Sequence, residues 1–564
     1  MVTTLPFDRV LSWDNESLEE SRLQLWSNEE TDVSAVEQAV RAERWGELES
    51  VDGFFAGVYE TQEKLFLFCD RMGVYPLFYW SQNGKGMACP HLPILLSAIG
   101  EKPQPCMDGV LSMLLFGHHL ADETLFDGVL RCNGGQTVVM DRQGRFADRV
   151  NWRTRHSFGE NEVSPAEMAE LFVEGVRIDQ AANSPIVIPL SGGFDSRAVL
   201  GATLECFSAD RIHTITFGGD DLFDRRVAAH VARTAGVKNT VFPITDEIYD
   251  ETFLRQRAAE YGYTYSAFAT QPPGMLSFLL EQMLQGNVLF WGAGGDAVAG
   301  SHLHRDDISL PRCESPEDRA RLLLHKRSFL PITTVSQMTG LSESDLIQSI
   351  AALVTRSTVP SYETAWQFLD AWDVYVRGSR ELIAVLPFRG QRWRCPHLTG
   401  GYYQTMMEQA FENKLNQNAY RRMLASRFRP LFELPSRRLK GRSLVGSQLS
   451  NIAWIVQWRA ARIRESLTER FGRPCDAAGR NYGKDRKFFR STRGRKTLQR
   501  TVETLKRASI LRGQAERIYK FTQDTPQAAL IATTLAYALD EQHSDAVAGA
   551  AVTHEALPGG SQWA

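Results

Sequence analysis

Six consecutive residues, Ser191 to Ser196, bring hydroxyls, glycines and a carboxylate together at one turn. The flanking sequence predicts a β-branched strand from Ile186 and a helix that opens near Asp195. A strand that enters a helix through a glycine turn presents free backbone N–H groups and the positive end of the helix to an anion. The stretch is therefore predicted to be a phosphate-binding loop.

Asp195 is the unexpected member of this loop, because a carboxylate repels a bare phosphate. Its presence is explained if a divalent cation, here Mg2+, bridges it to the phosphates. The loop lacks the Gly-Lys-Ser/Thr ending of a Walker motif, so that class is excluded. An ordinary tight strand–helix turn is the structural alternative.

A second candidate is the stretch FWGAGGDAVAGSH, from Phe290 to His302. It reads as a strand that ends in glycines and delivers Asp296. Two carboxylates from different strand ends, Asp195 and Asp296, are expected to hold a hydrated Mg2+ on pyrophosphate oxygens. For His302 and His304 a solvated loop is favoured over a role as ligands.

The elements that must position these residues alternate between helix and strand. This alternation predicts a parallel, doubly wound sheet with ligands at the carboxyl ends of its strands. The glycines after Phe217 lie where an adenine base would bind, or they are a simple exit from the strand. The predicted helices are 162–181, 197–206, 224–235 and 274–285, and the predicted strands are 212–217, 240–244 and 287–291.

Residues 1–155 are β-rich. The runs 54–59 and 65–68 predict a hairpin closed by the polar turn 60–64, and Gly134-Gly135 marks a turn before a strand at 136–140. A bend at Gly73 and Pro76 precedes a further aromatic strand.

Several of these motifs resemble known proteins. SGGFDS is similar to the pyrophosphate loop of ATP pyrophosphatases, which cleave ATP between the α- and β-phosphates. DGFFA, DRMGVYPLFYW and the segment ending in NGGQ resemble, in this order, the N-terminal domain of asparagine synthetases. The resemblance implies an α+β sandwich of the class II glutamine amidotransferase type, followed by an α/β synthetase domain with a helical C-terminal part.

The resemblance also identifies departures. In that family the glutaminase nucleophile is a cysteine at the mature N-terminus, whereas Val2 follows Met1 here. We therefore expect an inactive glutaminase that serves as a scaffold, with Cys69 as a buried structural thiol. Around Asp296, Ala293 and Ala297 replace acidic residues of the family. This puts aspartate amidation in doubt and favours a specialised acceptor, as in β-lactam synthetases and lasso-peptide cyclases.

Cations complete the expected site. Arg377 and Arg380 lie on a predicted helix directed at the segment 392–398, where they would bind a substrate carboxylate; a surface salt-bridge helix is the alternative. Lys440 falls where the family has a lysine on a mobile loop, and the resemblance assigns it to the charge on the acyl-adenylate. A solvated lysine is equally consistent with the sequence.

The resulting prediction has three parts: an amidotransferase-like domain at 1–155, an ATP-pyrophosphatase domain at 160–445 and a basic helical extension at 446–564. The expected cofactors are ATP and Mg2+, and the expected partners are a carboxylate substrate and a nitrogen donor; a homodimer is left open. The expected nucleotide-binding residues are Leu190, Ser191, Gly192, Gly193, Asp195, Ser196, Phe217, Gly218 and Gly292, with Asp195 and Asp296 as metal ligands and Lys440 and Arg377 as catalytic cations.

Composition sets the remaining expectations. The chain has 564 residues, a net charge of -4 and eight scattered cysteines, and its start does not resemble a signal peptide. We therefore expect a cytoplasmic enzyme without a membrane span. The basic run 484–496, with Phe488 and Phe489, is interpreted as a solvated helical face rather than a nucleic-acid site. A tRNA-modifying enzyme and a non-catalytic scaffold are the alternatives from other classes.

Overall fold

The computed structural model describes most of the chain. The described residues are 2–6, 9–13, 20–28, 30–100, 103–159, 163–177, 184–217, 222–242, 251–264, 287–360, 362–382, 392–470, 488–512 and 526–540.

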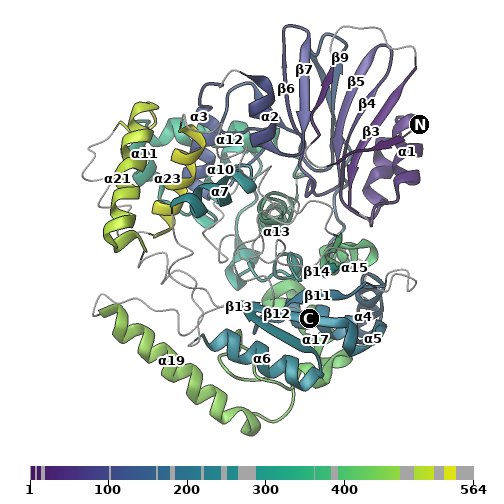
Figure 1. Ribbon diagram of the computed structural model, residues 1–564, viewed down its shortest axis with the longest axis vertical. Coiled ribbons are helices and arrows are strands. Elements are labelled where there is room, and N and C mark those ends of the chain that lie inside the picture. Colours follow the sequence, from purple (N-terminus) through teal and green to yellow (C-terminus); the bar gives the residue numbers. More distant parts are fainter. Residues whose placement is uncertain are drawn as a thin grey trace, which may run out of the picture.

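The N-terminal part is a sandwich of two sheets (Figure 1). The six-stranded sheet has the order β1-β3-β4-β5-β9-β10, and only its β1–β3 pair is parallel. The four-stranded sheet has the order β2-β7-β6-β8 and is antiparallel. The strands are β1 (Val2–Thr4), β2 (Leu11–Trp13), β3 (Arg22–Ser27), β4 (Phe55–Glu60), β5 (Lys64–Cys69), β6 (Phe78–Gln82), β7 (Lys85–Cys89), β8 (Val129–Arg131), β9 (Gln136–Asp141) and β10 (Phe146–Asn151).

Strand β5 explains why the sequence KLFLFC is apolar on both faces. Leu65 and Leu67 point into the core shared with the second sheet. Phe66 and Phe68 point to the other face, where they pack with residues of α1 (Val33–Arg41) and with Trp45. Because successive side chains alternate between faces, this strand is buried on both sides. The antiparallel pairing of β4 with β5 confirms the predicted hairpin.

The third sheet, in the synthetase part, is five-stranded and wholly parallel, with the order β13-β12-β11-β14-β15. From β11 the chain moves outward to β12 and β13, and then returns to the other side of β11 for β14 and β15. The switch point of the sheet therefore lies between β11 and β14, which is where open α/β sheets bind ligands. The strands are β11 (Ile186–Pro189), β12 (Ile212–Phe217), β13 (Lys238–Phe242), β14 (Val288–Phe290) and β15 (Arg392–Arg394).

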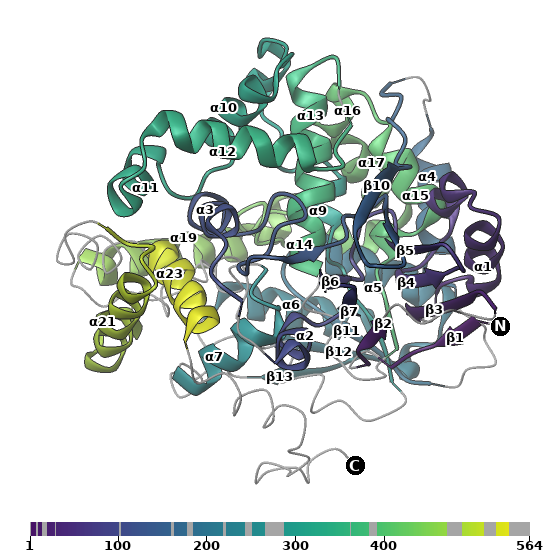
Figure 2. The ribbon, with the colours of Figure 1, turned by 90° about the horizontal axis from the view of Figure 1, so that it is seen from above.

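Helices pack around the parallel sheet and fill the space between it and the sandwich (Figures 1 and 2). The α-helices of eight or more residues are α1 (Val33–Arg41), α2 (Leu92–Ile99), α3 (Met107–Phe116), α4 (Pro165–Glu174), α5 (Asp195–Cys206), α6 (Phe223–Ala235), α7 (Glu251–Glu260), α10 (Pro316–Lys326), α11 (Ile332–Thr339), α12 (Glu343–Arg356), α13 (Ala365–Trp372), α15 (Gly400–Met407), α17 (Asn418–Arg427), α19 (Ile452–Arg470), α21 (Thr492–Arg507) and α23 (Pro526–Leu539). The shorter ones are α9 (Gly295–Val298), α14 (Ser379–Leu382), α16 (Phe411–Lys414) and α18 (Arg429–Phe432).

Most predicted elements of the synthetase part are confirmed. The strand predicted at 240–244 begins two residues earlier, as β13. The helix predicted at 274–285 and residues Gly218 and Gly219 lie outside the described residues, as do parts of 162–181 and the segment from 542.

The sandwich and the synthetase part are joined by residues of the N-terminal motifs. Asp52 accepts a hydrogen bond from the Gly400 amide (2.8 Å), and Arg71 donates one to the Leu398 carbonyl (2.9 Å). Phe54 stacks on Trp393 of β15, with ring centroids 5.0 Å apart. The motifs that suggested an amidotransferase therefore form much of the interface in this structure.

The C-terminal helix α23 returns to the N-terminal part of the chain. It packs on α3, α7 and α21 (Figure 2). Arg255 of α7 pairs with Asp540 at 2.9 Å, which fixes the end of this helix. Residues of the expected C-terminal extension thus complete the packing around α3.

Two negative findings concern the described residues. None of their helices combines the length and the apolar character needed to cross a membrane. The seven cysteines among them are all free thiols; Cys475 lies outside this set.

Candidate active site

The predicted phosphate-binding loop lies at the switch point of the parallel sheet. It follows β11, and α5 begins at Asp195. Within the loop, the Ser196 hydroxyl accepts a hydrogen bond from the Ser191 amide (3.0 Å), and the Ser191 hydroxyl accepts one from the Gly193 amide (3.1 Å). The Gly192 amide donates to Asp224 of α6 at 3.0 Å. The loop is thus a preformed turn whose N–H groups are held by short polar side chains.

The second motif follows the neighbouring strand β14 and packs directly on this loop. A Cβ atom at Gly292 would lie 2.8 Å from the Ser196 nitrogen, and one at Gly295 would lie 2.7 Å from Oδ1 of Asp195. Any side chain at these positions would clash, so the glycines permit the approach of the two strand ends. Glycine at positions 292 and 295 therefore allows the segment that follows β14 to pack on the loop. This packing brings Asp296 close to Asp195.

Asp195 is partly buried, and its Oδ1 atom is buried without a hydrogen bond from any described residue. Burial, reinforced by the negative charge of Asp296, raises the pKa of the Asp195 carboxyl well above its ordinary value. Leaving a buried carboxylate oxygen unpaired is costly. A cation bound at this position would remove that cost, so the donor set fits the expected divalent ion.

Asp296 is the outer member of the pair, with its side chain 56% exposed. Its Oδ1 atom accepts a hydrogen bond from Gln417 (3.0 Å) and pairs with Arg438 at 2.9 Å. Among the described residues no cluster of three or more His, Cys, Asp or Glu side chains could hold a metal. Two carboxylates that share an ion with substrate phosphates are the usual arrangement for Mg2+.

A buried hydrogen-bond relay supports Asp195. The Tyr420 hydroxyl lies near Asp195 and helps to lower the pKa of its carboxyl, against the larger effect of burial, and Nε2 of His397 lies 2.9 Å from that hydroxyl. A neutral His397 that donates through Nε2 would leave the single Tyr420 proton available to the Asp195 carboxylate. Burial lowers the pKa of His397 to about 3, so the ring is neutral. His397 stands where the family motif has Phe, and Tyr420 had no sequence signal.

Hydrogen bonds connect the segment from Pro435 to Arg438 to the phosphate-binding loop and to α5. The Gly192 carbonyl accepts hydrogen bonds from the Arg437 amide (3.1 Å) and the Ser436 hydroxyl (3.2 Å). Arg197 of α5 donates to the Pro435 carbonyl (2.9 Å). These hydrogen bonds position Arg438 to form an ion pair with Asp296. The neighbouring Arg437 forms an ion pair with Asp224 at 2.9 Å. No sequence motif marks either arginine as a site residue.

Lys440 itself lies at the end of the same turn, with φ of 59°. Its Nζ atom lies 5.8 Å from the centre of the Trp458 ring. The structure therefore brings Lys440 near Arg438 but places Arg438, not Lys440, on the candidate metal ligand. Asn416 and Gln417 also have positive φ, at 55° and 60°. Such backbone strain in non-glycine residues concentrates at functional sites.

The remaining predicted residues have different outcomes. Phe217 ends β12 and is half-buried, with its ring 6.2 Å from that of Phe242. Arg377 lies in a π-helical turn (Asp373–Gly378) and pairs with Asp373 at 3.7 Å. The carboxylate-binding interpretation of Arg380 is wrong, because its buried guanidinium donates to the carbonyls of His119 and Ala121.

The solvated-loop interpretation of His302 is also wrong. Its side chain is 9% exposed and its Nε2 atom lies 3.1 Å from the buried Asp370. Asp370 also binds Lys414, and both of their side chains are fully buried. His304 is exposed, as expected. Phe488 and Phe489 are buried, which agrees with the structural interpretation of the basic run.

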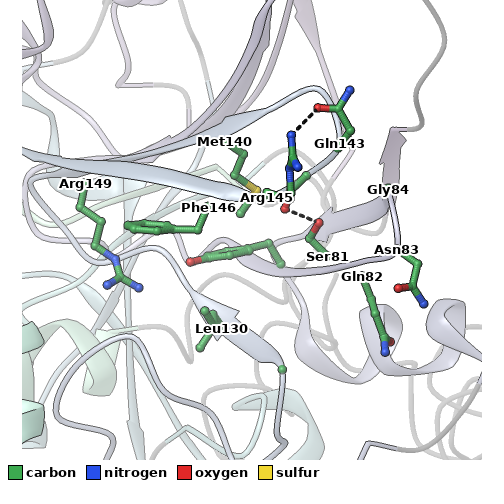
Figure 3. Close-up of a pocket in the computed structure, with 13 residues that line it drawn as sticks. Ser81, Gln82, Asn83, Gly84, Leu130, Met140, Gln143, Arg145, Phe146 and Arg149 are labelled. Atoms are coloured by element: carbon green, nitrogen blue, oxygen red, sulfur yellow. Dashed lines mark hydrogen bonds between the residues drawn. The ribbon is translucent and has the colours of Figure 1, made fainter.

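A further pocket lies elsewhere, in the N-terminal sandwich. It has a volume of about 600 Å³ and opens between the β6–β7 hairpin, β8 and the β9–β10 hairpin (Figure 3). Phe146 and Arg149 lie at one end of it and Asn83 at the other. It contains none of the predicted site residues and no thiol.

Two family models match successive parts of the chain. Residues 167–371 match the family model described as asparagine synthase, and residues 15–152 match that of a glutamine amidotransferase domain. The Methanocaldococcus jannaschii protein named "Putative asparagine synthetase (glutamine-hydrolyzing) 2" is 21% identical over 265 residues, 45% of this chain and 50% of that protein. Amidase chry2 of Gibberella zeae is 27% identical over 148 residues, 25% of this chain and 22% of that protein. The chain thus spans half or less of the length of these relatives.

Among solved structures, the glutamine phosphoribosylpyrophosphate amidotransferase of B. subtilis matches at 10% identity with a TM-score of 0.16. The match covers 52% of this chain and 60% of that chain. The sheet topology described above is what establishes the predicted fold class, a sandwich followed by a doubly wound parallel sheet.

Proposed function

Since this chain is a member of the asparagine synthetase family, we propose that it is an ATP-dependent carbon–nitrogen ligase that forms an amide through an acyl-adenylate. The observation that carries the proposal is the pair Asp195 and Asp296 at the ends of neighbouring parallel strands, with Oδ1 of Asp195 buried and unpaired. This is a site for a cation on a polyphosphate, and the loop beside it supplies N–H groups for phosphate oxygens.

In the proposed reaction a substrate carboxylate oxygen attacks the α-phosphorus of ATP, and the bond to the bridging oxygen of pyrophosphate breaks. A nitrogen nucleophile then attacks the acyl carbon, and AMP leaves with the electron pair. Asp195 and Asp296 would hold Mg2+, which when bound neutralises charge on the phosphates. Leu190, Ser191, Gly192, Gly193, Ser196 and Gly292 surround this position, and Phe217 and Gly218 are proposed for the adenine.

Binding of the phosphates would replace hydrogen bonds that the loop amides already form within the protein. The amides of Gly192 and Gly193 already have partners, in Asp224 and Ser191. Phosphate oxygens would take over these donors. The loop geometry is thereby fixed before the nucleotide arrives, which lowers the ordering cost of binding. Lys440 and Arg377 remain proposed catalytic cations, for the developing charge and for the substrate carboxylate.

The acceptor is proposed to be specialised. Ala293 and Ala297 leave no carboxylate beside Asp296 from its own motif, so ammonia has no hydrogen-bond acceptor there of the kind that the family resemblance implies. More specifically, we propose that the nitrogen nucleophile is an amine within a peptide or another natural product, as for a lasso-peptide or β-lactam-type cyclase. We also propose that the amidotransferase domain has no glutaminase activity. Burial raises the pKa of the Cys69 thiol well above its ordinary value, which makes it a poor nucleophile.

The decisive experiment is ATP–pyrophosphate exchange across a panel of carboxylates, with and without glutamine or ammonium. The expected result is exchange with at least one carboxylate that Asp195→Ala abolishes. Asp210→Ala, an exposed aspartate before β12, is the matched control and should leave exchange unchanged. Absence of exchange throughout the panel, together with ATP binding that is insensitive to Asp195→Ala, would refute the ligase. Ammonia release from glutamine would refute the inactive glutaminase.

A further inference from the structure

A basic pocket adjoins the proposed metal site. Its volume is about 450 Å³, and it lies between the turn 437–442, α17 and α19. Its charged lining consists of Arg421, Arg438, Lys440, Arg442 and Arg459, with Trp458 as an aromatic wall. None of the described residues that line it is acidic.

The charges of this pocket are largely uncompensated. Arg438 pairs with Asp296, but Arg421, Lys440, Arg442 and Arg459 form no salt bridge with any described residue. The proximity of Arg438 helps to lower the pKa of Arg421, after the larger effect of burial. Like charges held together around one cavity raise its potential and favour an anion with several negative oxygens.

Arg438 connects the pocket to the candidate metal ligands. It lines the pocket and also contacts Asp296 at 2.9 Å, and its turn is tied to the Gly192 carbonyl. An anion coordinated next to Asp296 would therefore extend directly into the pocket. The anion that the adenylation step releases at this position is pyrophosphate.

Resting on the proposed function, we infer that this pocket is a pyrophosphate site, and that α19 supplies part of it through Arg459 and Trp458. Arg438 is shared between Asp296 and the phosphate oxygens, while Arg421, Lys440, Arg442 and Arg459 receive the outer phosphoryl group. Arg459 lies well beyond the residues that match the asparagine synthase model. The helix α19, which packs on α6 at the edge of the molecule (Figure 1), thus has a role in the reaction.

The test is binding of inorganic pyrophosphate to the full chain by calorimetry, at two ionic strengths and without ATP. Arg459→Ala and Arg442→Ala should each weaken binding about two- to fivefold, as expected for exposed charge pairs, and the double variant more. The affinity should fall as salt is raised. Arg464→Ala removes the same charge from α19 without touching the pocket, and it should bind pyrophosphate like the unaltered chain.

Three outcomes would overturn the inference. One is that Arg459→Ala and Arg442→Ala bind pyrophosphate like Arg464→Ala. Another is that the unaltered chain does not bind pyrophosphate. The last is that a hexaglutamate peptide binds more tightly than pyrophosphate and loses affinity in the same variants, which would assign the pocket to an acidic peptide. Because binding is measured without a carboxylate substrate, it separates the two proposals. If the chain has exchange activity but Arg459→Ala and Arg442→Ala leave the pyrophosphate affinity unaltered, only the proposed pyrophosphate site is refuted. If these variants weaken pyrophosphate binding but the chain shows no exchange with any carboxylate, only the proposed ligase function is refuted.

Discussion

At the scale of single residues, the proposed chemistry depends on how Asp195 is oriented. The Oδ1 atom of its carboxylate is buried, and the Tyr420 hydroxyl, which His397 contacts, lies near it. Groups that orient a metal ligand contribute to metal affinity even though they do not touch the metal. The relay therefore belongs to the site, although neither member would contact the nucleotide.

We predict that Tyr420→Phe weakens metal binding about 10- to 100-fold, the range for the loss of a partner that orients a metal ligand. The measurement is Mn2+ binding to the chain by electron paramagnetic resonance, repeated as the Mg2+ dependence of exchange. Tyr402→Phe is the control, because the Tyr402 ring packs on the same histidine with centroids 6.1 Å apart. Equal Mn2+ affinities in the two variants would show that the Tyr420 hydroxyl does not orient Asp195.

The sequence was sufficient for Asp195 and Asp296, because each belongs to a local motif whose glycines and strand can be recognised in a few residues. It was insufficient for Tyr420, Gln417 and Arg438. These side chains reach the site from segments more than 100 residues away, and no local pattern marks them. His397 was visible only as a departure from the family motif.

At the scale of elements, the site depends on two strand ends that approach closely. Gly295 is the contact point, since a Cβ there would lie 2.7 Å from Asp195 Oδ1 and 2.8 Å from His397 Cδ2. We predict that Gly295→Ala displaces Asp195 and removes exchange activity, with a loss of about 1–3 kcal/mol in stability from overpacking. Exchange assays and thermal unfolding check both parts.

Gly46→Ala is the matched control, because no atom lies within 4 Å of a Cβ built there. If Gly295→Ala retained full exchange activity, the close approach of β14 and α5 would not be required for the reaction. The alternation of strands and helices predicted this approach in outline, because consecutive parallel strands end at one edge of a sheet. The strand order, which places β14 beside β11, could not be read from local sequence.

At the scale of the whole molecule, the amidotransferase-like domain contributes buried groups to the synthetase interface. Nε2 of His156, which follows β10, forms a short hydrogen bond with the Tyr375 hydroxyl in the π-helical turn. Burial, followed by the positive charge of Lys414, lowers the pKa of His156 to about 3. The unfolded chain takes up a proton at this residue below about pH 6.5. The stability that His156 contributes is therefore complete above pH 6.5 and is lost as the pH falls toward 3.

We predict that acid destabilises the unaltered chain more steeply than His156→Phe. The difference should approach about 1.4 kcal/mol per pH unit between pH 6 and pH 4, because only the unaltered chain gains a proton on unfolding. Apparent melting temperatures of both proteins at pH 7.5, 6, 5 and 4 give the comparison. Parallel curves would mean that His156 does not resist protonation in the folded state.

The helix α23 has a consequence for how the chain is made. It covers α3, which is emerging from the ribosome roughly 400 residues before α23 does. At typical synthesis rates of 5–20 residues per second, that interval is on the order of 20–80 s. During it the surface of α3 that α23 will cover lacks this partner, so the nascent chain presents an apolar surface for chaperones. A premature stop before Pro526 would make that exposure permanent, even though every proposed catalytic residue had been synthesised.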